Sequence, residues 1–129
     1  MLGDGELQEC MVWEAVMAAA HYKLDNLVII VDNNGLQIDG PLSQVMSPEP
    51  IAEKFEAFGC FTVEIDGHDY DEIIMALNNA RQVKGQPSAI IAHTIKGKGC
   101  SFMENRPEWH GKVPNAEEVE KALLELTIG

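Results

Sequence analysis

Continuous apolar runs alternate with amphipathic segments along this chain, and each predicts a different element. Residues 27–31 form an uninterrupted branched run between Asp25-Asn26 and Asp32-Asn33-Asn34-Gly35, which predicts a central strand covered on both faces. Residues 61–65 alternate apolar and polar positions well enough for a strand, and residues 88–94 predict another buried strand. The spacing between these runs leaves room for helices.

The first helical segment, residues 7–22, is apolar nearly all round. A helix of this composition is expected to be buried on most of its sides. Its alanines permit close approach of another helix, so a subunit contact and ordinary core packing both remain open.

Capping residues mark three further helices. Ser47-Pro48-Glu49 supplies an N-cap, a first-turn proline and a first-turn acid before an apolar face. Asp69 is positioned to cap the next helix, and Asn115 with Glu118 forms a capping box for the last one. These signals predict where the helices begin.

The order of elements predicts an α/β fold. Helices alternating with apolar strands give an open, doubly wound parallel sheet with right-handed crossovers. A length of 129 residues with 46% hydrophobic content suits one domain, residues 1–129. In this fold a strand should end at Gly3-Asp4-Gly5, directly before the first helix, yet only Met1 and Leu2 precede this motif. We therefore expect the sheet to be truncated at its amino-terminal side.

The charge balance limits the partners. A formal net charge of -12 and a pI near 4.5 argue against nucleic acid and anionic membranes, because both are bound by clustered Lys and Arg. An anionic small ligand would have to be held locally by a metal, by backbone N–H groups, or by both.

Cysteine usage and the first residues indicate a compartment. Cys10, Cys60 and Cys100 lie far apart, in neither a zinc-site nor a disulfide-scaffold pattern, which predicts a reduced, cytoplasmic protein. The first residues lack a basic region followed by an apolar stretch, and no run reaches membrane-spanning length. We expect neither export nor membrane insertion.

Two polar motifs follow neighbouring predicted strands. Asp4 and Asn34 are 30 positions apart, which is what a turn, a helix of about four turns and a strand consume. In a parallel sheet their oxygens converge at one edge, where ligands bind. A carboxylate with an amide oxygen suits Mg²⁺ or Ca²⁺, and Mg²⁺ completes its shell with water and phosphates. Gly5 lets a phosphate approach the helix start.

The alternative interpretation is that the two polar motifs have only a structural role. Gly3-Asp4-Gly5 would then be a turn with an N-cap aspartate, and Asn33-Asn34-Gly35 a polar strand exit. Each motif alone favours this interpretation. The two motifs together, at this spacing and with a helix and strand between them, favour a binding site.

Several stretches of the sequence resemble one family. Gly3-Asp4-Gly5 with the later Asn33-Asn34 resembles the signature shared by thiamine-diphosphate enzymes. GDGELQE, HYKLDNLVIIVDNNGLQIDG, IDGHD, HTIKGKG and EWHGK are similar to transketolase, especially the amino-terminal subunit of transketolases split over two chains, and the resemblance covers essentially all 129 residues. It implies the thiamine-diphosphate-binding fold, and within it the carboxy-terminal part of the domain that holds the diphosphate and metal.

The resemblance implies a metal site. Asp4 and the Asn34 side chain would be ligands of Mg²⁺ or Ca²⁺, with the Leu36 carbonyl as a third ligand.

It also implies contacts with thiamine diphosphate. Gly5 would face the diphosphate, and Gly3 and Glu6 belong to the same cofactor-binding motif. Ile38 and Ile95 match positions that pack around the thiazolium ring, where apolar walls exclude water. A plain core role is the alternative, above all for Ile95.

The four histidines differ in their expected roles. His110 matches a histidine close to the diphosphate and substrate, and its place in an irregular loop beside Gly111 makes it the best general acid/base or hydrogen-bond candidate. We expect His21 and His68 to be structural, and His93 remains open.

Two further features have competing interpretations. Glu9 matches a glutamate near the dimer interface that joins a proton network between two cofactors, whereas the sequence alone favours a first-turn acid that complements the helix dipole. Lys96-Gly97-Lys98-Gly99 offers cations and exposed amides to a phosphate, or is a solvated turn.

The implied reaction is reversible transfer of a two-carbon ketol unit between sugar phosphates. It would need the upstream part of the same domain and a pyrimidine-binding transketolase subunit, in a homo- or hetero-oligomer, so this chain alone should be inactive. Two alternatives remain: a non-catalytic domain fragment, or part of a relative such as 1-deoxyxylulose-5-phosphate synthase or dihydroxyacetone synthase. Cys10, where relatives usually have glycine, does not separate them.

Overall fold

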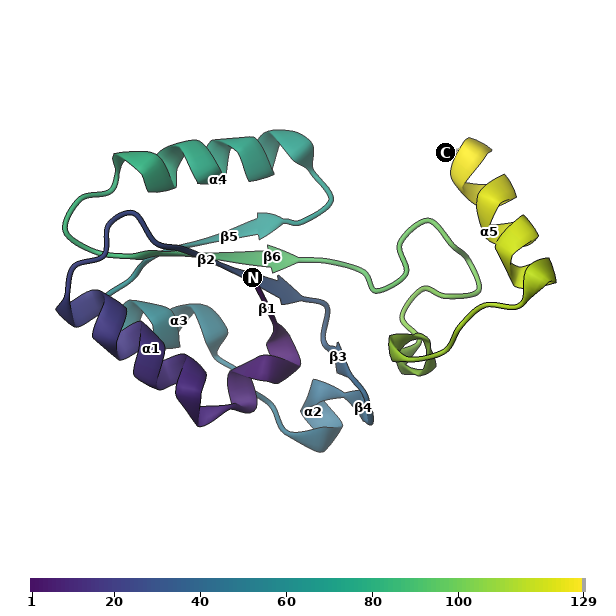
Figure 1. Ribbon diagram of the computed structural model, residues 1–129, viewed down its shortest axis with the longest axis horizontal. Helices are drawn as coiled ribbons and strands as arrows, with labels where there is room; N and C mark the ends of the chain where they lie inside the picture. The colour runs from purple at the N-terminus through teal and green to yellow at the C-terminus, as the bar shows by residue number, and fades with distance from the viewer. Residues whose placement is uncertain (129) are drawn as a thin grey trace.

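The computed structural model describes residues 1–128 as a parallel sheet with helices on both faces and an arm extending from its carboxyl end (Figure 1). The elements in chain order are β1 (Leu2–Gly3), η1 (Asp4–Gln8), α1 (Cys10–His21), β2 (Val28–Asn33), β3 (Leu36–Gln37), β4 (Gly40–Pro41), α2 (Leu42–Val45), α3 (Ile51–Ala57), β5 (Phe61–Asp66), α4 (Tyr70–Gln82), β6 (Ser88–His93), η2 (Pro107–His110) and α5 (Ala116–Ile128).

The main sheet has the strand order β1-β2-β6-β5, and every neighbouring pair is parallel. The predicted α/β fold with an open parallel sheet is therefore confirmed. β2 and β6 are central, and their apolar runs carry the residues that both layers of helices cover. All four strands end at the same edge, next to β3, β4 and the start of the arm (Figure 1).

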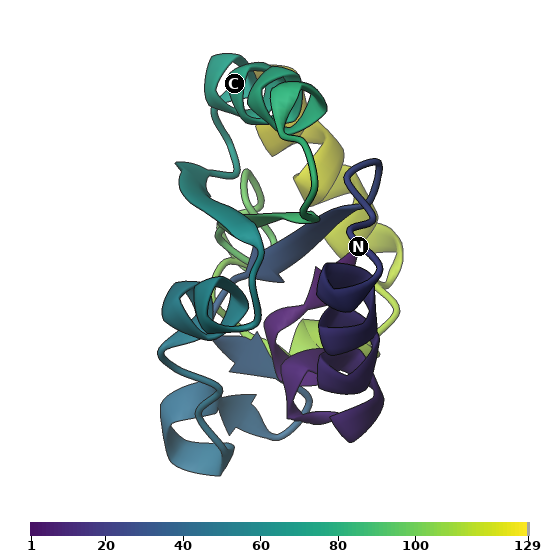
Figure 2. The same ribbon diagram turned by 90° about the vertical axis from the view of Figure 1, so that its left-hand side faces the viewer.

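Two apolar clusters lie on opposite faces of the sheet. On one face, α1 and α3 pack side by side against β2 and β6 through residues such as Val16, Phe55 and Val31 (Figure 2). On the other face, α4 covers β5 and β6, where Ala76 packs with Ile90. This arrangement makes the sheet doubly wound, as predicted.

The first helix differs from its prediction in two ways. Residues 4–8 form a 3₁₀ turn, Glu9 is extended, and α1 begins at Cys10. The prediction that this helix is buried on most of its sides is wrong. Val16 and Ala19 are buried, but Met11 and Met17 are 71% and 55% exposed. Only one face of α1 packs on the sheet, and among residues 1–128 no other helix covers its outer face.

The capping predictions give two confirmations and one error. The Asp69 carboxylate accepts hydrogen bonds from the N–H groups of Asp71 and Glu72, and the Asn115–Glu118 capping box is formed in both directions. The helix expected from Ser47-Pro48-Glu49 instead begins at Ile51, after Pro50. Glu49 precedes a proline, which disfavours helical backbone at that residue.

The strand before Asp4, which the sequence predicts to be missing, is present as a two-residue β1, in which Leu2 pairs with Val31 and Gly3 with Asp32. This short strand places Asp4 directly beside the end of β2. Within residues 1–128, no helix is both long and apolar enough to cross a bilayer.

Candidate functional site

Asp4 is the first residue of η1 and directly follows β1, which ends at Gly3. Its carboxylate is 1% exposed and accepts the Gly35 N–H at Oδ2 (N···O 2.6 Å) and the Gly5 N–H at Oδ1 (2.7 Å). Gly35 follows the end of β2. The predicted convergence of the Asp4 and Asn34 motifs is thus observed at the backbone that follows the two adjacent strands.

The Asn34 side chain is fixed by hydrogen bonds at both of its polar atoms. Its Oδ1 accepts the Leu36 N–H (3.0 Å), and its Nδ2 donates to Asp32 Oδ1 (3.3 Å). Asp32 also accepts the hydroxyl of Thr94, which lies just beyond β6. The Asp32 side chain therefore joins the ends of β2 and β6, as the Asp4 side chain joins the ends of β1 and β2.

The electrostatics of Asp4 favour a cation. Burial of the Asp4 carboxyl raises its pKa above the usual value. Hydrogen bonds from the backbone of Gly35, Gly5 and Asn34 oppose this effect, and the nearby Asp32 charge adds to it. The charged form of Asp4 is thus destabilised by its surroundings, and a positive ion beside it would relieve that cost.

Most of the predicted site residues line one pocket of about 540 Å³. The residues brought together there are Gly3, Asp4, Gly5, Glu6, Glu9, Asn34, Leu36, Ile38 and His110. They come from residues 3–9, from residues 34–38 around β3 and from the distant η2, so the pocket depends on the tertiary fold.

Four other residues line this pocket: Gln8, Asp32, Gln37 and Lys96. The sequence had indicated only Lys96, through its loop after a strand edge. Gln37 lies against Gly5, where an added Cβ would come within 3.1 Å of Gln37 Cβ, a tight contact that glycine avoids. Among the described residues, Gln37 Nε2 is buried without a hydrogen-bond partner. No sequence pattern predicted that contact.

The donor set at this edge suits a hard cation that also binds phosphate. Nowhere in residues 1–128 do three His, Cys, Asp or Glu side chains gather into a group that could hold a metal by themselves. Asp4, the Asn34 amide oxygen and the Leu36 carbonyl instead offer a mixed oxygen set, of the kind that Mg²⁺ completes with water and phosphate oxygens. The residues present therefore fit a metal that is held jointly with a ligand.

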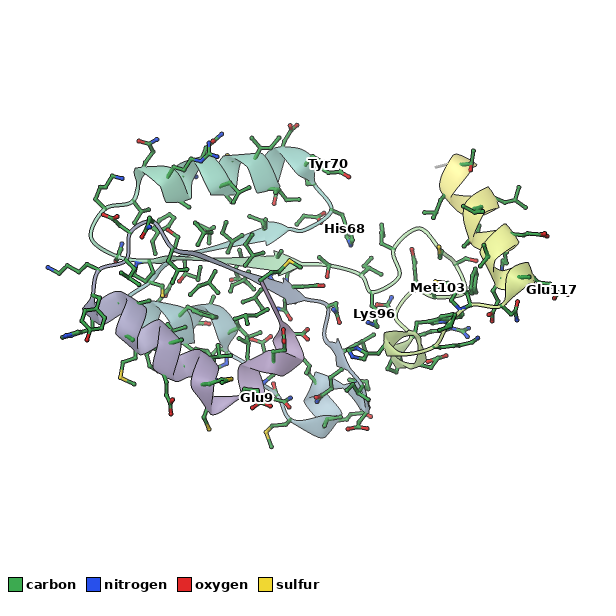
Figure 3. The ribbon with its side chains drawn as sticks, in the orientation of Figure 1. Glu9, His68, Tyr70, Lys96, Met103 and Glu117 are labelled. Carbon is green, nitrogen blue, oxygen red and sulfur yellow. The ribbon has the colours of Figure 1, made fainter. Side chains whose placement is uncertain are left out.

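His110 and Glu9 line the pocket from elements far apart in the sequence. His110 is the last residue of η2, which lies against β3, and its side chain is exposed. Glu9 is exposed at the junction of η1 and α1, and Lys96 lies where the arm leaves the sheet (Figure 3). An imidazole at this wall can donate or accept a proton at a bound ligand.

Of the predicted site residues, all of them within the described range, only Ile95 lies outside this pocket. It lines a neighbouring hollow with Ile65 and His68, and its N–H donates to His68 Nε2 (2.8 Å). His68 therefore has a local hydrogen-bonding role, as expected of a structural histidine.

Comparison with known proteins decides the family. The thiamine diphosphate binding domain of transketolase matches residues 1–128. The chain belongs to the transketolase family.

Named transketolase subunits and solved transketolases are similar along the whole chain. It is 48% identical over 126 residues to a subunit of the apulose-4-phosphate transketolase of Actinobacillus succinogenes, covering 98% of this chain and 45% of that protein. It is 42% identical over 127 residues to the protein of the same name in Phocaeicola vulgatus, again 98% of this chain and 45% of the relative. The transketolase structure from Campylobacter jejuni superposes with a TM-score of 0.90 at 37% identity, over 98% of this chain and 20% of that one.

The match covers nearly all of this chain but only part of each relative. The chain spans less than half the length of the two apulose-4-phosphate transketolase subunits and a fifth of the Campylobacter jejuni transketolase. The transketolase resemblance predicted from the sequence is confirmed, and so is its similarity to subunits of split transketolases.

Proposed function

We propose that this chain anchors a divalent metal and the diphosphate of thiamine diphosphate in a transketolase that transfers two-carbon ketol units between sugar phosphates. The observation that carries the proposal is the buried Asp4 carboxylate, held against Gly35 at the ends of adjacent parallel strands. A pocket that already contains most of the predicted cofactor residues opens at this point.

In this proposal Asp4, the Asn34 amide oxygen and the Leu36 carbonyl hold Mg²⁺, or Ca²⁺ in its place. The ion would offset the burial cost that raises the pKa of Asp4, and phosphate oxygens would complete its shell. Gly5 and Lys96 line the same pocket, where they offer space for close approach and a positive charge. An acidic chain can bind an anion in this way because the favourable charge is local.

Thiamine diphosphate, when bound, supplies the reactive carbon and the electron sink for ketol transfer. The chain's own residues bind, orient and exchange protons. Ile38 would give an apolar wall to the ring, and His110 would donate or accept a proton at a substrate oxygen. Glu9 is proposed to meet the partner subunit beside α1, whose outer face carries the exposed Met11.

The remaining machinery is proposed to lie outside these residues. Because the two apulose-4-phosphate transketolase subunits are more than twice as long, the upstream part of the domain and a second, pyrimidine-binding subunit would complete the enzyme. The relatives described above are named transketolases, which supports ketol transfer over synthase chemistry. We expect the isolated chain to be inactive.

Calorimetric titration with Mg²⁺ and thiamine diphosphate tests the proposal. This chain, supplied with the upstream part of the domain and a pyrimidine-binding transketolase subunit, should bind the cofactor only with the metal present. Asp4→Ala should abolish that binding, whereas Asp71→Ala, in the exposed first turn of α4, should not change it. Wild-type affinity in Asp4→Ala would contradict the assignment. A ketol-transfer assay on the same assembly separates transketolase from a non-catalytic domain.

A further inference from the structure

His110 lies on the arm and not on the sheet, so its position depends on contacts within the arm. The arm leaves β6 after His93, forms the turns around residues 97–105, and returns through η2 before it enters α5. Figure 3 shows this segment extending beyond Lys96, with Met103 and Glu117 on its far side. A residue that fixes this segment also fixes the imidazole.

Trp109, the residue before His110, is anchored to the turn region. Its indole Nε1–H donates to the Phe102 carbonyl (3.1 Å), and the two rings meet edge to face with centroids 5.5 Å apart. The indole is half-buried, whereas His110 is exposed. Trp109 is therefore held within the arm, whereas its neighbour His110 lines the pocket.

Lys112, two residues after His110, closes the other side of the indole. Its Nζ lies 4.0 Å from the centroid of the Trp109 ring, a cation–π geometry. The same Nζ pairs with Glu118 Oε1 at 2.6 Å. The residues on both sides of His110 therefore converge on one cluster.

Glu118 connects this cluster to α5. Its second oxygen accepts the Asn115 N–H (2.8 Å), and its own N–H donates to Asn115 Oδ1 (2.9 Å). One carboxylate thus completes the helix cap and holds Lys112 on the indole. A helix end fixed on both sides gives the loop that carries His110 a rigid base.

The distal part of α5 is fixed to the turns as well. Glu125 accepts the Ser101 N–H (2.6 Å) and the Ser101 hydroxyl (2.7 Å). Lys121 lies 4.9 Å from the centroid of the Phe102 ring, which also contacts Trp109. α5 therefore holds both the Phe102 side and the Lys112 side of the indole.

We propose that Trp109, Lys112 and Glu118 form a clamp that positions His110 for the proton-transfer or hydrogen-bonding role assigned above. This inference rests on the proposed function for the role of His110, and on the contacts alone for its position. None of the three clamp residues lines the cofactor pocket, so they act through His110 and do not touch the ligand.

The clamp is tested in the assembled enzyme with paired variants. Trp109→Phe keeps a ring but removes the Nε1–H. Glu118→Gln keeps the capping box, because glutamine also serves at that position, but removes the ion pair. Lys112→Met removes the charge that contacts Trp109 and Glu118. Lys112→Arg keeps a positive charge at this position and should preserve the clamp. Glu117→Gln, one residue away on the exposed first turn of α5, is the matched control.

We expect Trp109→Phe to lower kcat by about tenfold, since a small misplacement of a reacting group costs rates of this order, while thiamine diphosphate affinity stays within about twofold. In a His110→Ala background the same substitution should have no further effect. An equal loss in both backgrounds would show that Trp109 acts independently of His110 and would overturn the inference.

A second measurement is independent of activity. NMR signals of the His110 ring should shift and sharpen in Trp109→Phe and Lys112→Met, and should stay unchanged in Glu117→Gln and Lys112→Arg. Unchanged ring signals in the clamp variants would refute positioning. If His110→Ala leaves ketol transfer intact, the proposed role of His110 is wrong. The NMR signals of the His110 ring still test whether the clamp positions it.

Discussion

The Asp4 carboxylate accepts a 2.6 Å hydrogen bond from the backbone N–H of Gly35, 31 positions along the chain. This bond joins the ends of β1 and β2, and the buried carboxylate lies at the point where the candidate pocket opens. Burial of this kind disfavours the charged carboxylate, and the cost should be measurable in the stability of the fold.

Without metal, stability should depend on pH through Asp4. Burial raises the folded-state pKa of Asp4 above its ordinary value of 3.8, so the folded protein holds this proton more tightly than the unfolded chain. The contribution of Asp4 is therefore most favourable below the ordinary value and is lost as pH rises through the raised one. Urea unfolding of wild type and Asp4→Asn should be measured across this pH range. The free energy of unfolding of wild type should fall relative to that of Asp4→Asn as pH rises.

Mg²⁺ with thiamine diphosphate should reverse this trend, because the proposed metal would bind the deprotonated Asp4 carboxylate. Adding both ligands should therefore stabilise wild type increasingly as pH rises through the Asp4 pKa. A pH-independent difference between wild type and Asp4→Asn would contradict an Asp4 origin.

Lys96→Ala should weaken binding of thiamine diphosphate by about tenfold, the usual scale for losing a hydrogen bond to a charged group. Lys96 lines the proposed cofactor pocket, whereas Lys98 lines the neighbouring hollow that contains Ile95. Lys98→Ala is therefore the matched control. Calorimetry at two salt concentrations measures the effect, and equal losses in the two variants would indicate a general effect of charge.

Gly97→Ala should destabilise the arm by roughly 2 kcal/mol or more. Gly97 has φ +74, and an added Cβ would lie 2.7 Å from Met103 Cβ and 2.8 Å from the Met103 carbonyl carbon and oxygen. Gly111→Ala is the control, because a Cβ added at Gly111 would meet no other atom within 4 Å. Thermal unfolding compares the two variants, and equal stability would show that the arm adjusts freely at Gly97.

The attachment of α5 should weaken in acid. The Ser101 hydroxyl and N–H, followed by Lys121, hold the pKa of Glu125 below its usual range. A lowered folded-state pKa means that this contribution is present above the ordinary value and is lost as pH falls through the lowered one. NMR titration should place the Glu125 midpoint higher in Ser101→Ala than in wild type, and amide exchange at Ser101 should accelerate in acid. An unchanged midpoint would exclude Ser101 as the cause.

Local signals predicted much of this structure because they depend on near neighbours. Asp69 and the Asn115–Glu118 pair cap helices through bonds that span two or three residues, so sequence alone locates them. The helix after Ser47 is predicted too early because a second proline, Pro50, also shapes this segment. Ser47 Oγ instead accepts the Glu49 N–H in a turn.

Sheet topology made the closeness of the Asp4 and Asn34 motifs predictable. Parallel strands end at one edge, so Asp4 and Asn34 had to be close. The entry of Gln37 into the pocket wall depends on side-chain packing against Gly5, which no spacing rule contains. Ile95 shows the same limit, because the path of the chain beyond β6 directs it toward His68. The exposure of α1 could not be predicted either, since an apolar pattern does not reveal which surface covers it.

The two-residue strand β1 also determines how ordered the cofactor edge can be. Asp4 follows a strand that pairs at only Leu2 and Gly3, so fraying of those residues would withdraw the carboxylate and separate it from Gly35. A disturbance that loosens Leu2 from Val31 would therefore affect the proposed metal site first, while the three longer strands stay paired and the rest of the sheet stays folded.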